Sequence, residues 1–180
     1  MQITKTTISA QSKNYIDFSN CKRLFAVDYS GSVKNCPFYH RNLRKIFDEL
    51  YKPGDTIMTW SDGAEIVSYN KIKEIYTQEL GTNNTCPSSI LHLLYQNHSI
   101  PREHLILVTD GRIDSEEVND CDEFVTKNHI VFKYVTAYVI GDGGDLSVGT
   151  AFARNCGSIT YEVKESGTRA IMGAFSSDFT

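Results

Sequence analysis

Two short apolar runs, each ending in an acid, constrain the fold of this chain most strongly. The first is KRLFAVD, which covers Lys22–Asp28, and the second is LILVTD, which covers Leu105–Asp110. Their apolar side chains are nearly continuous and do not alternate with polar ones. That pattern is typical of strands covered on both faces, as in a parallel sheet with helices on each side. We therefore expect both runs to lie in the interior of such a sheet.

The rest of the chain alternates between helix and strand patterns. The expected elements, in chain order after the first strand, are a helix from Pro37 that ends before Pro53-Gly54, strands Thr56–Trp60 and Glu65–Ser68, a short helix near Lys71–Tyr76, a helix from Pro87, strand Leu105–Thr109, a helix from Ser115, strand Lys133–Ile140, helix Val148–Arg154, strand Ser158–Val163 and helix Thr168–Phe175. The Asp62-Gly63 pair is a tight-turn signal, so the second and third strands should form a hairpin. The alternation predicts an α/β fold, a doubly wound and mostly parallel central sheet with one antiparallel edge hairpin.

Length and composition favour a single domain that has no need of disulfides. The chain has 180 residues and a formal net charge of −4, which argues against a non-specific nucleic-acid binder. Residues 1–20 are polar and are expected to be an N-terminal arm or an edge strand (Thr4–Ile8), with the domain proper over 21–180. The start has no apolar signal core, and the five cysteines include no C-x-x-C pair. We expect a cytoplasmic protein with free thiols and no membrane span.

The residues that follow the two apolar runs form a candidate metal site. The first run ends in Asp28, with Ser30 and Ser32 at alternate positions after it, and the second ends in Asp110. Ligands in sheets of this type bind beyond the carboxyl ends of the strands, so both acids should lie at the binding edge. In an extended loop, side chains two residues apart point the same way, which would bring Asp28, Ser30 and Ser32 together. Carboxylates and hydroxyls are hard oxygen ligands, so the set favours Mg²⁺, or Mn²⁺.

Three segments of the chain resemble the von Willebrand factor type A (vWA) domain family. LFAVDYSGSV is similar to the D-x-S-x-S motif of that family's metal-ion-dependent adhesion site, and LILVTDG is similar to its second acidic segment. Between them the family places a threonine in a glycine-rich loop before a helix. Here that segment is ELGTNNTCPSSILHLL, where Thr85 is preferred as the metal ligand and Thr82 is the rival choice. The resemblance spans residues 22–176 and implies a Rossmann-like vWA fold.

The resemblance also implies a function. In the family, the metal ion commonly binds a Glu or Asp carboxylate of a partner protein, so the chain is expected to be a protein-interaction module and not an enzyme. Intracellular members of the family tend to be assembly or adaptor subunits, some of which work with AAA+ ATPases. Such an ATPase, or another assembly, is the partner class expected here, with no nucleic acid and no membrane. Tyr29, Asn83, Asn84 and Arg112 could form the rim that faces the partner.

Other interpretations of the same residues stay open. Acids at strand ends also serve Mg²⁺-dependent phosphohydrolases, although Ser30 stands where one such class carries Asp. A structural vWA scaffold with an empty metal site is a third possibility. Asp114 could tune the site, but a loop or capping role is favoured, and Thr85 could cap the following helix. Gly141–Asp145 fits a turn, and the five histidines show no metal-binding spacing.

Overall fold

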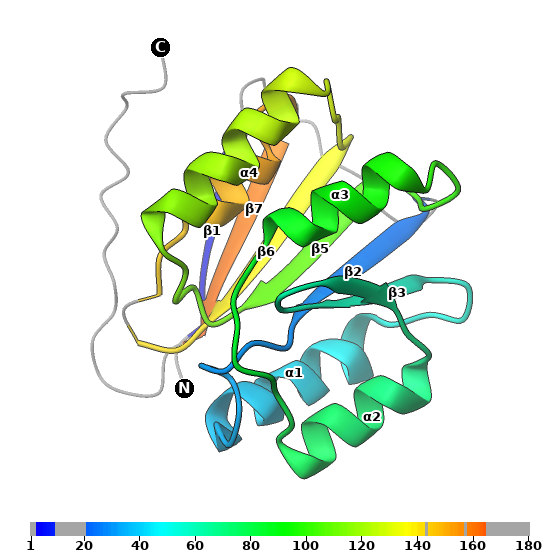
Figure 1. Cartoon of the computed structure of the whole chain (residues 1–180). Coiled ribbons are helices and arrows are strands. Elements are labelled where there is room, and N and C mark those ends of the chain that lie inside the picture. Colours follow the sequence, from blue (N-terminus) through cyan, green and yellow to red (C-terminus); the bar gives the residue numbers. More distant parts are fainter. Residues whose placement is uncertain (1–2, 10–20, 143, 157, 165–180) are drawn as a thin grey trace.

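The computed structural model describes residues 3–9, 21–142, 144–156 and 158–164 of the chain (Figure 1). Strands and helices alternate along most of it. The elements are β1 (Ile3–Ser9), β2 (Arg23–Asp28), α1 (Pro37–Leu50), β3 (Thr56–Trp60), β4 (Ala64–Ile66), α2 (Tyr69–Gln78), α3 (Ser88–Gln96), β5 (His104–Thr109), α4 (Ser115–Lys127), β6 (Tyr134–Ile140), α5 (Ser147–Phe152) and β7 (Ser158–Lys164). They build one seven-stranded sheet with helices on both faces.

The strand order confirms the predicted fold class. The sheet runs β1-β7-β6-β5-β2-β3-β4, and β2 pairs in parallel with both β3 and β5. The strands that end in the two acids are therefore direct neighbours. The expected antiparallel hairpin forms one edge as β3 and β4. The opposite edge is also antiparallel, because β1 pairs with β7 over its whole length.

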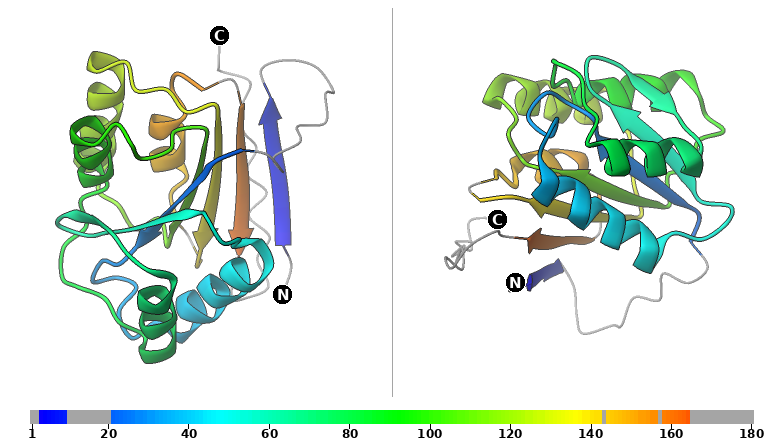
Figure 2. Two further views of the ribbon diagram at one scale, coloured as in Figure 1. Left: turned by 90° about the vertical axis from the view of Figure 1, so that its right-hand side faces the viewer. Right: turned by 90° about the horizontal axis from the view of Figure 1, so that it is seen from below.

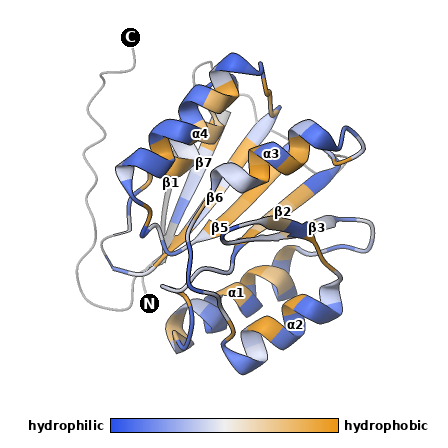
Figure 3. Cartoon of the chain, in the orientation of Figure 1, coloured by the Kyte–Doolittle hydropathy of each residue, from blue (hydrophilic) through white to orange (hydrophobic). Residues whose placement is uncertain are grey.

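The sheet separates two apolar cores, because successive side chains of a strand point to opposite faces. Alternate residues of β2 illustrate this: Leu24 and Ala26 pack with α3, α4 and α5, whereas Phe25 and Val27 pack with α1 and α2. The two groups of helices lie on opposite sides of the sheet (Figure 2). Apolar residues line the strands, and polar residues cover the outer faces of the helices (Figure 3). The continuous apolar pattern of β2 and β5 is thus a consequence of burial on both faces.

Some element boundaries differ from the prediction. The third strand was expected at Glu65–Ser68, but β4 ends at Ile66. Ser68 belongs instead to the next helix, since its side chain accepts a hydrogen bond from the backbone N–H of Lys71 and caps α2. This cap begins α2 earlier than the expected Lys71. The expected last helix, Thr168–Phe175, lies outside the described residues.

Two further observations concern the state of the cysteines and the presence of membrane-spanning helices. All five cysteines are free thiols, and Cys121 is fully buried. Within the described part of the chain, no helix is both long and apolar enough to cross a membrane. The absence of disulfides agrees with the free thiols that the cysteine spacing predicted.

Candidate metal site

Asp28 lies at the carboxyl end of β2 and is completely buried. One carboxylate oxygen, Oδ1, accepts a hydrogen bond of 2.9 Å from the backbone N–H of Ser30. The other, Oδ2, accepts a hydrogen bond of 2.7 Å from the hydroxyl of Thr109 on the neighbouring strand β5. These two bonds fix the orientation of the carboxylate at the edge of the sheet.

The second acid, Asp110, follows β5 directly and is 7% exposed. Its Oδ1 accepts a hydrogen bond of 3.0 Å from the backbone N–H of Arg112. Burial, together with the nearby charge of Asp110, raises the pKa of Asp28 to about 6, although its hydrogen bonds act in the opposite direction. No Lys, Arg or His among the described residues forms an ion pair with either acid. The two carboxylates therefore form a buried, like-charged pair that a cation would stabilise.

The two serines of the D-x-S-x-S motif come together beside Asp28. Ser30 is buried, Ser32 is half-buried, and their hydroxyl oxygens lie 3.1 Å apart. The expected extended loop is wrong, because residues 31–35 form successive turns, and Asn35 has a φ of 55°. The tight turn brings the two hydroxyls together through a folded backbone. The spacing of the motif was thus informative, but the predicted loop geometry was not.

Two residues that support Asp28 were not singled out from the sequence. Thr109 donates to Asp28, and its hydroxyl oxygen accepts the backbone N–H of Gly111 at 3.0 Å. Tyr39 on α1 donates its hydroxyl to the carbonyl of Asp28 at 2.9 Å and approaches that of Val108 at 3.4 Å. Tyr39 thus links the ends of the two acid-bearing strands from the face of the sheet that α1 and α2 cover. Its role depends on where α1 packs, which no local motif shows.

The segment between α2 and α3 crosses the edge of the sheet directly over the serine loop. The backbone N–H and the hydroxyl of Thr82 both donate to the carbonyl of Tyr29, at 2.8 and 3.2 Å. The two chain segments touch through glycines. A Cβ atom on Gly81 would lie 2.6 Å from the carbonyl oxygen of Ser30, and one on Gly31 would lie 2.8 Å from that of Thr82. Only glycine allows this close crossing of two backbones.

The two candidate threonines of this segment have different surroundings. The hydroxyl of Thr82 is used to hold the loop to Tyr29. Thr85 is half-buried, and its hydroxyl has no hydrogen bond to any described residue. Thr85 is not the helix cap that the sequence allowed, since the N-cap position of α3 is Pro87. No hydrogen bond joins Thr85 to Asp28 or the serines within the described chain.

Replacing Gly81 with Ala is expected to destabilise the protein and displace the loop that carries Thr85. The added methyl group would meet the backbone of Ser30 and of Lys34, which cannot move as a flexible side chain would. Overpacking of this kind costs about 1–3 kcal/mol. Chemical denaturation of Gly81→Ala, compared with wild type, measures this loss.

Gly63→Ala is the matched control, because a Cβ at Gly63 would meet nothing within 4 Å. It should unfold at nearly the same denaturant concentration as wild type. Equal stability of Gly81→Ala and Gly63→Ala would contradict the close crossing.

The loops after β5 and β6 form the other side of the site. Gly111 has a φ of 73°, and a Cβ there would lie 2.7 Å from the backbone nitrogen of Asp145. Asp145 donates its N–H to the carbonyl of Gly111 at 3.0 Å. The Gly-Asp-rich segment near 141–145 was expected to be a turn, and its described residues pack against the second acidic segment. Neighbouring strands β5 and β6 impose this contact.

The predicted rim residues are mostly accessible. Asn83, Asn84 and Arg112 are exposed, and Tyr29 is half-buried. Asp114 occupies the N-cap position of α4, but its side chain makes no capping hydrogen bond. Tyr29 follows Asp28 directly and the backbone N–H of Arg112 bonds to Asp110, so these two residues adjoin the acids.

The chemistry of the donors fits a hard cation. In the described residues, no group of three or more His, Cys, Asp and Glu side chains is placed to share a metal ion. The available donors are the carboxylates of Asp28 and Asp110 with the paired hydroxyls of Ser30 and Ser32. Oxygen donors of this kind suit Mg²⁺ or Mn²⁺ and not a soft metal.

Sequence comparisons connect the chain to a viral protein. No protein-family model matches it. The chain is 23% identical over 157 residues to the Early 94 kDa protein of Autographa californica nuclear polyhedrosis virus. The alignment covers 79% of this chain and 20% of the viral protein. The chain therefore spans about a fifth of that relative's length.

Structural comparisons give a more specific view of the fold. The manganese-loaded TRAP protein of Plasmodium vivax is similar with a TM-score of 0.51 and 14% identity, over 89% of this chain and 72% of that one. An aerotolerance-related membrane protein of Bacteroides fragilis is similar with a TM-score of 0.50 and 12% identity, over 80% and 90%. At such low identity, the likeness concerns the fold alone. The chain has a vWA-like fold.

Proposed function

We propose that this chain is a vWA domain that acts as a metal-dependent protein-interaction module. Asp28, Ser30, Ser32, Thr85 and Asp110 would hold one Mg²⁺ or Mn²⁺ ion at the edge of the sheet. Once bound, the ion supplies an electropositive centre that can accept a carboxylate. The partner would be a protein that offers a Glu or Asp side chain.

One observation carries this proposal most directly. Asp28 and Asp110 are buried beside each other, and no cationic side chain of the described chain is ion-paired with either. Burial of two carboxylates without a compensating charge is costly, so the arrangement favours a bound cation. The close pair of serine hydroxyls adds neutral oxygen donors at the same place.

The loop geometry and the comparisons add support. The Thr82 hydroxyl already holds the loop, whereas the Thr85 hydroxyl has no partner in the described chain, which favours Thr85 as the ligand. The similar TRAP structure is a manganese-loaded protein. The rim residues Asn83, Asn84 and Arg112 are accessible to a partner.

Metal binding is expected to raise the thermal stability of the wild-type protein. Mg²⁺ or Mn²⁺ at about ten times its dissociation constant should add about 1.4 kcal/mol. For a chain of this length, that corresponds to a rise in Tm of roughly 3–6 °C over the value in EDTA. Differential scanning calorimetry of wild type and Asp28→Ala, in EDTA and in metal, tests this expectation.

Asp62→Asn is the control, because Asp62 is an exposed acid at the end of the neighbouring strand β3. It should keep the metal response, and Asp28→Ala should lose it. An unchanged Tm in metal for all three proteins would favour a scaffold with an empty metal site. That outcome would contradict the proposed metal site.

Partner binding is tested by affinity capture from lysate with Mg²⁺ or with EDTA. A partner, such as an AAA+ ATPase or another assembly, should be retained by wild type with Mg²⁺ and released by EDTA. Asp28→Ala should not retain it. A peptide of the captured protein in which Glu and Asp are replaced by Gln and Asn should then fail to bind.

The same proteins distinguish an enzymatic function. We propose no catalytic role, since no lysine of the described chain is ion-paired with Asp28 or Asp110. A screen with generic phosphate esters should show no turnover above the Asp28→Ala background. Turnover that depends on both Mg²⁺ and Asp28 would favour a phosphohydrolase instead.

A further inference from the structure

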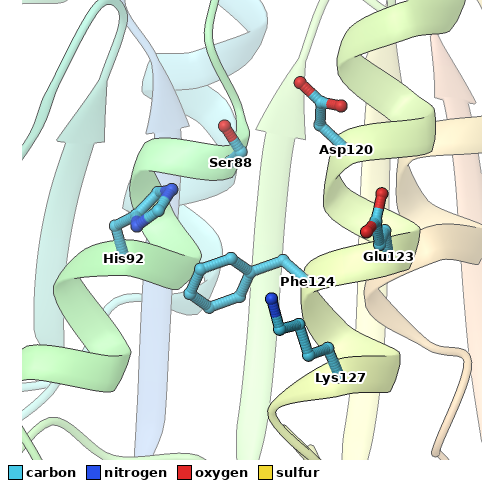
Figure 4. Close-up of a pocket in the computed structure, with 6 residues that line it drawn as sticks. All are labelled: Ser88, His92, Asp120, Glu123, Phe124 and Lys127. Atoms are coloured by element: carbon cyan, nitrogen blue, oxygen red, sulfur yellow. The ribbon is translucent and has the colours of Figure 1, made fainter.

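A groove of about 220 Å³ lies between α3 and α4, and none of its lining residues is a candidate metal ligand. Its lining consists of Ser88 and His92 on α3 and Asp120, Glu123, Phe124 and Lys127 on α4. The residues on α4 follow one another at helical spacing, so they share one face of that helix. Figure 4 shows the ring of Phe124 projecting between the two helices toward His92.

The floor of the groove is aromatic. The centroids of the Phe124 and His92 rings lie 4.4 Å apart at an angle of 62°. Tyr95 packs edge-on against Phe124 with the ring centroids 6.0 Å apart, and it is 53% exposed. An exposed tyrosine beside a half-buried phenylalanine offers a surface on which a flat or apolar group can pack.

The wall of the groove carries acids without partners. Asp120 and Glu123 are both exposed, and neither forms an ion pair with a described residue. Asp122 on the same helix differs, because Arg154 forms an ion pair with it. The groove therefore presents two uncompensated carboxylates beside an aromatic ring.

Lys127 is the one cationic residue among the side chains that line the groove. Its side chain runs along the groove, and its ammonium group points toward the ring of Phe124 (Figure 4). It forms no ion pair with Asp120 or Glu123. A lysine of the chain itself thus shares the groove with the two carboxylates but is ion-paired with neither.

We propose that the groove binds an arginine side chain presented by a partner protein. The planar guanidinium group stacks on aromatic rings and forms paired hydrogen bonds with carboxylates, which matches Phe124 with Asp120 and Glu123. Arginine fits better than lysine, because a lysine ammonium bonds as a point charge and cannot stack. The net charge of −4 on the chain favours the approach of a basic segment. This surface is independent of the proposed metal site, so binding here should persist in EDTA.

The test uses a fluorescein-labelled Gly-Ser peptide that carries two arginines, and the same peptide with citrulline at both positions. Citrulline keeps the shape of arginine but removes its charge. Fluorescence anisotropy in EDTA measures binding to the whole chain, and amide NMR shifts identify the residues affected. The arginine peptide should bind with shifts centred on α3 and α4, and the citrulline peptide should bind at least tenfold more weakly.

Substitutions of the groove residues test whether the peptide binds in the groove. Asp120→Asn combined with Glu123→Gln should weaken binding about tenfold or more, and Phe124→Leu should weaken it severalfold. Glu49→Gln combined with Asp62→Asn removes the same charge at exposed positions that lie on neither α3 nor α4, and it is the matched control. Lys127→Ala should strengthen binding, because it removes the competing cation. Thermal unfolding confirms that each variant is folded.

Two results would overturn the proposal. Equal binding of the arginine peptide by the groove variant and the control variant would show that only net charge matters. Weaker binding of the arginine peptide by Lys127→Ala, with unchanged binding by Asp120→Asn combined with Glu123→Gln, would show that the two carboxylates do not hold the arginine. Because every titration is done in EDTA, loss of the metal site would alter neither result.

Discussion

Asp28→Asn is expected to stabilise the metal-free protein at pH 7.5 and to abolish its response to Mg²⁺ and Mn²⁺. Asp28 is fully buried, and its pKa is raised to about 6 by burial and by the charge of Asp110. At pH 7.5 the folded protein must therefore hold two buried charges of the same sign. The amide removes one of them and can keep both hydrogen bonds, accepting from Ser30 and donating to Thr109.

The size and direction of this effect follow from proton linkage. The unfolded chain releases the Asp28 proton near the ordinary pKa of 3.8, whereas the folded protein keeps it until pH is about 6. The free energy of unfolding therefore falls as pH rises from 3.8 to 6 and stays lower above that range. A difference of about two pH units corresponds to about 2–3 kcal/mol. Asp28→Asn should gain this amount at pH 7.5 and gain almost nothing at pH 4.

Urea denaturation in EDTA at the two pH values measures the gain. Asp62→Asn, which changes an exposed acid in the same way, should leave the free energy of unfolding almost unchanged at both. Added metal should then stabilise wild type but not Asp28→Asn. Lower stability of Asp28→Asn than of wild type at pH 7.5 in EDTA would contradict the prediction. It would show that the buried carboxylate of Asp28 does not destabilise the folded protein.

His104→Gln is expected to remove an acid sensitivity that comes from the opposite end of the sheet. His104 begins β5 and is 5% exposed, and its Nε2 lies 2.8 Å from the hydroxyl of Thr136. Burial, and to a smaller extent the charge of Arg23, lowers the pKa of His104 to about 4. A glutamine amide at this position could still donate to Thr136 but would not titrate.

The sign for His104 is opposite to that for Asp28. Below its ordinary pKa of 6.5 the unfolded chain takes up a proton at His104, and the folded protein does so only near pH 4. The free energy of unfolding of wild type therefore falls as pH drops from 6.5 to 4. The loss is of the order of 2–3 kcal/mol, and His104→Gln should not show it.

Asp28 and His104 together predict how the free energy of unfolding of each variant changes with pH. Between pH 4 and 6, their contributions to wild type have opposite slopes and offset each other. Asp28→Asn should therefore become more acid-sensitive than wild type, and His104→Gln should become less so. His98→Gln, a change at an exposed histidine, should follow wild type. Parallel pH profiles for all four proteins would refute both assignments.

The fold class could be predicted because it depends on local pattern. Leu24–Val27 and Leu105–Val108 are apolar without interruption, and only a strand covered on both faces needs such a run. Proline and glycine positions indicated where helices begin and end, as at Pro37. The boundary near Ser68 was missed because its capping role depends on the helix that follows.

The candidate site could be predicted in part. The acids and serines stand in a recognisable spacing, and they lie where strands end. The convergence of Ser30 and Ser32 was expected from an extended loop, but a folded turn produces it. Thr85 was preferred to Thr82 as the metal ligand, but the sequence could not decide between them, because the choice depends on which hydroxyl is used to hold the loop.

The sequence by itself determined the apolar strands, the acids at their ends and the type of chemistry that those acids allow, since these depend on residue type and short spacing. Only the tertiary structure decided that β2 and β5 are neighbours and that Tyr39 joins their ends. It also decided that Gly81 crosses Ser30 and that α3 and α4 enclose an acidic, aromatic groove. Those contacts join residues far apart in the chain, and they form because burying two apolar faces of one sheet fixes where every helix and loop must pass.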